Sequence, residues 1–210
     1  MPQLPDELSA HSPDSDSQAG CHDGDKLAVL VCPGFHRKAL TQGFVRSLPA
    51  FVAPHIVPTF PADPVATFQS IKFVFRRQPI VAIGFSAGVV GLVGALKLWQ
   101  HQGGQIHQIF VIDGWGVPSL GLPISRISHD AFTHWSSLPL GLGNVNFYAD
   151  PGVPHLQMWG IPEHVAGWQT GRPTDLSVTV TAPFNSRCQA MTAQDFLHSQ
   201  LHTCFGRLVR

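Results

Sequence analysis

The feature that most constrains the fold is a series of short apolar runs separated by stretches of helical length. The apolar runs that read as strands lie at 27–32, 55–57, 80–83, 109–112 and 145–148. The stretches between them that carry apolar residues at helical spacing lie at 38–50, 64–76 and 89–96. Strands buried on both faces and joined by helices build parallel sheets. We therefore predict an α/β protein with a mostly parallel central sheet, helices on both faces and no large cap domain.

Composition separates residues 1–25 from the rest of the chain. This segment is rich in Ser, Asp, Pro and Gly, lacks aromatic residues and holds six of the 13 acidic residues. We expect it to be a disordered acidic and polar tail, followed by one domain over 26–210. Within that domain, 114–144 is rich in glycine and proline, so we expect no long element there and consider a small lid or a cleft-lining insertion. Farther on, we expect a helix from Pro162 to Trp168, a strand at 177–182 and a last helix over 192–209.

Charge and composition exclude several classes of function. The 13 basic residues balance the 13 acidic ones and are scattered, so we expect no nucleic-acid partner. No apolar run reaches the length of a membrane span and no signal peptide is visible, so we expect a cytoplasmic protein with no stable membrane insertion. No phosphate-binding loop, dinucleotide fingerprint or zinc spacing occurs, and we predict no cofactor and no metal. The four cysteines share no CxxC spacing and read as structural thiols: Cys21, Cys32, Cys188 and Cys204.

A pentapeptide between an apolar run and an apolar helix carries the chemistry. Gly84-Phe85-Ser86-Ala87-Gly88 matches the G-x-S-x-G pattern, with a predicted buried strand before it and a predicted buried helix after it. A nucleophile elbow needs this context, because the strained turn lifts the serine hydroxyl above the edge of the sheet. The glycines are needed where a side chain would collide with the neighbouring strand and helix. Ser86 is the candidate nucleophile.

With this elbow, the order of elements and the Pro33-Gly34-Phe35-His36 turn after the first strand, the chain resembles the α/β-hydrolase superfamily over about 27–169. Many members have a His-Gly turn where this chain has Pro33-Gly34. The resemblance implies an oxyanion hole formed by the backbone N–H groups of Ala87 and Phe35. We interpret His36 as a polar residue at the lip of the pocket.

The general base has to be chosen among 12 histidines by position. His155 lies in a loop after a strand and before a possible helix, which is where the superfamily holds its base, and it is our first candidate. His129 and His134 form a rival cluster and are the alternatives. His164, in the expected helix after His155, is also left by position. Apart from these and His36, the histidines fall in the tail, on the wrong side of the sheet or on the last helix.

The orienting acid should follow a strand at the same sheet edge as the serine. Asp113 ends the strand candidate 109–112 and is our candidate; Asp150, which ends the next one, is the alternative. Ser86, Asp113 and His155 occur in the Ser…Asp…His order of this fold. No histidine lies between the strand candidate 177–182 and the last helix, which counts against His155 if that strand is the superfamily's final one.

These residues predict a serine hydrolase of the esterase, lipase or thioesterase kind, which cleaves an ester, thioester or amide with an apolar acyl group. The partner is then a small-molecule acyl substrate. An acyltransferase with the same acyl-enzyme, or an inactive hydrolase fold used for binding or scaffolding, is the alternative. The aromatic residues of the second half of the chain could wall the acyl pocket or belong to the core: Trp115, Phe132, Trp135, Phe147, Trp159 and Trp168.

Overall fold

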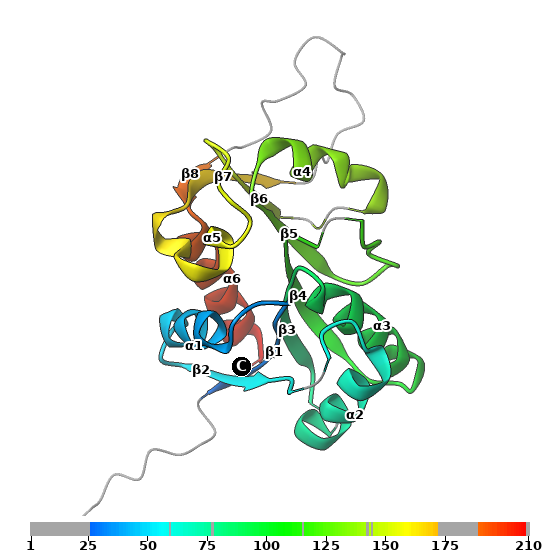
Figure 1. The fold of residues 1–210 in the computed structure, drawn as a ribbon. Helices are drawn as coiled ribbons and strands as arrows, with labels where there is room; N and C mark the ends of the chain where they lie inside the picture. Colours follow the sequence, from blue (N-terminus) through cyan, green and yellow to red (C-terminus); the bar gives the residue numbers. More distant parts are fainter. Residues whose placement is uncertain are drawn as a thin grey trace, which may run out of the picture.

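An eight-stranded sheet runs through the molecule (Figure 1). The computed structural model describes residues 26–58, 60–76, 78–114, 116–141, 143, 145–171 and 189–208. The strands are β1 (Leu27–Cys32), β2 (Val52–Ile56), β3 (Ile80–Phe85), β4 (Ile106–Ile112), β5 (Ile124–Ser128), β6 (Val145–Ala149), β7 (Ala166–Gly171) and β8 (Gln189–Thr192). Their order is β2-β1-β3-β4-β5-β6-β7-β8. The pairs from β2 to β6 are parallel, and β7 and β8 add antiparallel pairs at one edge. The predicted α/β class with a mostly parallel sheet is confirmed.

Helices cover both faces of the sheet. On one side lie α1 (Lys38–Ser47), α5 (Gln157–Gly160) and α6 (Ala193–Leu208), and on the other α2 (Pro64–Phe75) and α3 (Gly88–His101) (Figure 1). The short α4 (Ala131–Ser136) packs against β5 and β6. Short 3-10 turns occur at η2 (Leu138–Leu140) and η3 (Pro162–His164). None of the helices in the described ranges is both long and apolar enough to span a bilayer.

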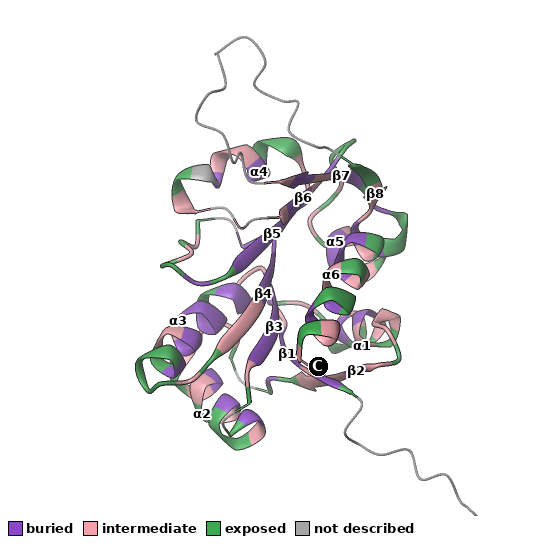
Figure 2. Cartoon of the chain, turned by 180° about the vertical axis from the view of Figure 1, so that it is seen from behind, coloured by how far each residue is buried: buried purple, intermediate pink, exposed green. Residues whose placement is uncertain are grey.

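Two apolar clusters fill the two sides of the sheet, because successive side chains of a strand point to opposite faces. Val29 and Val31 of β1 join the cluster under α1, α5 and α6, whereas Leu30 joins the one under α2 and α3. Figure 2 shows this burial along β3, β5 and β6. The unbroken apolar runs therefore have a physical cause: both faces of these strands lie under helices.

The structure adds detail in one segment and differs from the sequence analysis in another. Residues 114–144, where we expected no long element and considered a lid, contain short elements: β5, which is buried within the sheet, α4 and the η2 turn. Pro162 begins only the η3 turn, and the expected helix to Trp168 is replaced by β7, which pairs with β6. Pairing with a neighbouring strand overrides local propensity here. The tail 1–25 and the expected strand 177–182 lie outside the described residues.

The buried Arg126 in β5 holds the segments on either side of it. The residue is 2% exposed, and its guanidinium donates hydrogen bonds to the carbonyl oxygens of Val117 at 2.7 Å and Gly141 at 2.8 Å. Burial lowers its pKa. The side-chain oxygen of Asn146 accepts from the Arg126 backbone N–H at 3.0 Å. These hydrogen bonds attach the irregular segments before and after β5 to the sheet.

Candidate active site

Ser86 occupies a left-handed turn between β3 and α3. Its φ of +52° is a conformation that a residue with a side chain rarely adopts. Two close approaches require the flanking glycines: a Cβ on Gly84 would lie 2.8 Å from Leu92 of α3, and one on Gly88 would overlap the carbonyl oxygens of Cys32 and Pro33. The strained serine is thus held between a buried strand and a helix start, as a nucleophile elbow requires.

Two backbone amides near Ser86 are available to a ligand. The N–H groups of Ala87 and Phe35 donate no hydrogen bond to a described residue. Ala87 is the N-cap of the 14-residue α3, so the positive end of the helix dipole faces the turn. Gly34 lies against the serine, since a Cβ there would be 3.0 Å from Ser86 Cβ. The amides expected from the resemblance therefore flank the serine on both sides.

Asp113 lies next to Ser86 at the carboxyl edge of the sheet. Phe85 and Ile112 are partners in the β3–β4 register, and the Ser86 N–H donates to the Ile112 carbonyl at 2.9 Å. The Asp113 side chain is 2% exposed. Its Oδ1 accepts a hydrogen bond of 2.8 Å from the backbone N–H of His129. The residue also has a positive φ, of 50°. The buried carboxylate is thereby fixed in place.

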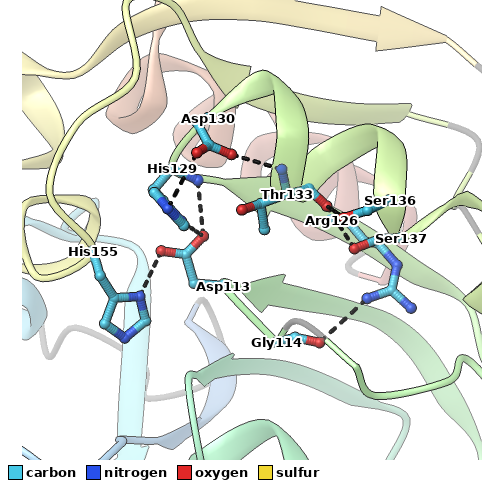
Figure 3. A network of polar contacts seen from close by, with 9 residues as sticks. All are labelled: Asp113, Gly114, Arg126, His129, Asp130, Thr133, Ser136, Ser137 and His155. Atoms are coloured by element: carbon cyan, nitrogen blue, oxygen red, sulfur yellow. Dashed lines mark hydrogen bonds and ion pairs between the residues drawn. The ribbon is translucent and has the colours of Figure 1, made fainter.

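His155 reaches the same carboxylate from the loop between β6 and α5. Its Nδ1 lies 2.8 Å from Asp113 Oδ2, and the side chain is 40% exposed (Figure 3). The loop is tied to the end of β5, because the Val153 N–H donates to the His129 carbonyl at 2.9 Å. With Nδ1 occupied by Asp113, the other ring nitrogen, Nε2, is left for a proton transfer.

The imidazole of His155 also rests on the residue before the serine. It stacks on Phe85 with 4.6 Å between ring centroids, and Phe85 in turn stacks on Trp159 at 5.0 Å. The Ser86 hydroxyl makes no hydrogen bond to a described residue, His155 included. Hydrogen bonds of this kind are often long in unliganded enzymes and shorten when substrate binds.

The alternative residues take other places. His129 approaches the other oxygen of Asp113: its Nδ1 is 3.1 Å from Oδ1, without the alignment of a hydrogen bond (Figure 3). His134 is fully buried, its ring against Trp135 and Tyr148, and burial and the charge of Arg126 lower its pKa to about 4. Asp150 accepts a hydrogen bond of 3.0 Å from the Trp168 indole. Of the base and acid candidates, the structure thus brings His155, His129 and Asp113 together.

A second histidine of the site, His36, follows the Phe35 amide. Its Nε2 bonds to Thr41 Oγ1 at 2.8 Å, and its ring meets the edge of Phe85. Burial, then the charge of His155, lowers its pKa. The bond to Thr41 fixes the imidazole in place beside Phe85.

Asp113, His129 and His155 also form a candidate metal site. One donor atom from each lies within 4.8 Å of the others. Two imidazoles and a carboxylate are a ligand set that zinc accepts. In this structure Nδ1 of His155 lies 2.8 Å from Asp113 Oδ2, and a metal held between these two atoms would take the place of that hydrogen bond.

Two comparisons with known proteins gave no relative. No protein-family model matches the chain. No curated protein matches it either. The function proposed below therefore rests on the geometry of the site and on the resemblance of the Ser86 motif to that of α/β-hydrolases.

Proposed function

We propose that the protein is a serine hydrolase that cleaves an ester, thioester or amide of an apolar acyl group. The observation that carries the proposal is the Asp113–His155 hydrogen bond of 2.8 Å at the sheet edge where Ser86 sits on a strained turn. Nucleophile, base and orienting acid come from three separate segments, and a site assembled in this way fits the requirements of acyl transfer.

The steps follow from the roles of these groups. Ser86 Oγ attacks the substrate carbonyl while Nε2 of His155 takes its proton, and Asp113 keeps the proton on Nδ1 of the imidazole. The negative oxygen of the tetrahedral intermediate is bound by the N–H groups of Ala87 and Phe35, and each such donor contributes on the order of 3 kcal/mol. His155 then protonates the leaving group. Water, activated by the same imidazole, releases the acyl group from Ser86.

The fold supports the resemblance to α/β-hydrolases but is common to many α/β proteins, so the site has to carry the argument. The sheet is mostly parallel, and the serine and the acid follow adjacent strands. An acyltransferase would use the same acyl-enzyme with an alcohol or amine in place of water.

Turnover of 4-nitrophenyl butyrate tests the proposal. The wild type should release nitrophenol well above the rate in buffer, and Ser86→Ala should abolish the excess. Ser70→Ala is the matched control, because the Ser70 hydroxyl donates to the Ala66 carbonyl within α2, away from the site. Equal rates for wild type and Ser86→Ala would contradict the proposal. An alcohol can then be added to the assay. If part of the acyl group is recovered as a new ester and nitrophenol release is not slowed, the protein is a transferase.

A further inference from the structure

A cavity of about 590 Å³ opens beside the predicted oxyanion hole, on the side of β1, β2 and α1. Its apolar lining consists of Pro33, Phe35, Ile56, Val57, Pro58 and Pro61. This size is in the range of small-molecule sites, which bury apolar ligand groups and hold a few polar groups in fixed positions.

Gly34 places the cavity next to the site. It lines the cavity, and a Cβ on it would lie 3.0 Å from Ser86 Cβ. Phe35, whose amide is proposed for the oxyanion hole, follows Gly34 and is also a lining residue.

Four polar side chains complete the lining: His36, Lys38, Thr41 and Gln42. Nε2 of His36 bonds to Thr41 at 2.8 Å, and its buried Nδ1 has no hydrogen-bond partner among the described residues. Lys38 and Gln42 are exposed, so the charged group of the lining lies in solvent.

An exposed aromatic pair lies next to this lining. Phe35 and Phe60 are 62% and 63% exposed, and their rings meet edge to face with centroids 4.9 Å apart. Exposed aromatic surface of this kind is typical of a site that binds an apolar group.

We propose that this cavity receives the acyl chain of the substrate and that the enzyme prefers medium-length acyl chains to acetyl and butyryl groups. The proposal rests on the proposed hydrolase function. Of the aromatic residues that we considered for the acyl pocket, none of those that the structure describes lines this cavity, and Trp115 lies outside the described residues. Phe147 and Trp159 are fully buried core residues, Phe132 is 74% exposed and Trp168 bonds to Asp150.

A chain-length series tests the preference. The wild type should hydrolyse 4-nitrophenyl octanoate with a kcat/KM at least about tenfold above that for the butyrate, since each buried methylene adds transition-state binding. Ile56→Trp puts a larger side chain on a half-exposed position of the lining and should remove this preference, because octanoate turnover should fall more than butyrate turnover. Phe73→Trp, an exposed aromatic change on α2, is the matched control and should keep the preference. An unchanged preference in Ile56→Trp would overturn the proposal.

Binding without turnover separates the cavity from the proposed function. Ser86→Ala should bind decanoate in calorimetry, and Ser86→Ala with Ile56→Trp should bind it at least about tenfold more weakly. If no ester is hydrolysed but this difference is found, the hydrolase function fails and the cavity remains an acyl site. If decanoate binds equally to both proteins or to neither, the cavity assignment is wrong.

Discussion

Asp113 and His155, 42 residues apart in the chain, are joined by a hydrogen bond of 2.8 Å between Oδ2 and Nδ1. His129 stabilises both partners through its backbone: its N–H donates to Asp113 Oδ1, and its carbonyl accepts from Val153 in the loop that carries His155. The end of β5 therefore positions the acid and the loop of the base together. This arrangement gives the pair a fixed geometry before substrate binds.

Replacing the acid should impair chemistry more than binding. Asp113→Asn removes the charge that fixes the His155 tautomer and should lower kcat by about 10³ to 10⁴ with a small change in KM. Asp150→Asn is the matched control, because Asp150 accepts from Trp168 instead. Steady-state kinetics on one ester checks both variants. If kcat falls further in Asp150→Asn than in Asp113→Asn, Asp150 is the orienting acid.

Two glycine substitutions should change stability in opposite directions. An alanine at Gly88 would press its Cβ on the carbonyl oxygens of Cys32 and Pro33 and should destabilise the fold by at least about 2 kcal/mol. Gly43 lies within α1 and nothing lies within 4 Å of its added Cβ, so Gly43→Ala should stabilise by about 0.5–1 kcal/mol. Urea unfolding measures both. A neutral Gly88→Ala would refute the tight packing of the turn.

His134 should make the fold sensitive to acid. Its pKa is near 4 in the folded protein, below its ordinary value of 6.5, because the buried ring resists protonation. The unfolded chain therefore binds the extra proton first, and stability falls as the pH drops from about 6.5 to 4, by on the order of 3 kcal/mol in all. His134→Phe should lose about 2 kcal/mol less than the wild type between pH 7.5 and 5.0 in urea unfolding. An unchanged pH dependence in this variant would contradict the buried, neutral imidazole.

Metal removal should leave activity intact. The proposed mechanism needs Nδ1 of His155 to carry a proton toward Asp113, whereas a metal bound between this nitrogen and Asp113 would displace that proton. Dialysis against EDTA should therefore preserve ester turnover, and added zinc should inhibit by taking His155, His129 and Asp113 as ligands. Activity lost in EDTA and restored by zinc would instead identify a metal-dependent hydrolase.

The sequence was sufficient to predict the strands that are buried on both faces. The runs at 27–32, 80–83 and 109–112 match β1, β3 and part of β4, because two layers of helices leave only apolar positions there. It was not sufficient for β5. Ser125, Arg126 and Ser128 look like surface residues, and the burial of Arg126 depends on distant carbonyl groups that accept its hydrogen bonds.

Part of the candidate site could likewise be predicted from the sequence, and part could not. Ser86 is visible in the motif, and Asp113 and His155 are candidates because each follows a strand at one sheet edge. The position of His129 on the second oxygen of Asp113 depends on β5, which the sequence analysis missed. The cavity at Gly34 depends on how α1 and the residues after β2 meet, and no local pattern encodes that contact.

Labelling with a fluorophosphonate probe tests the central claim, that Ser86 is activated by the Asp113–His155 pair. The purified wild type should label at one serine, which peptide mapping should locate at Ser86, and Ser86→Ala should not label. His155→Ala should label far more slowly than His129→Ala, because only His155 is to act as the base. A wild type that stays unlabelled, or a probe found on another serine, would contradict the account.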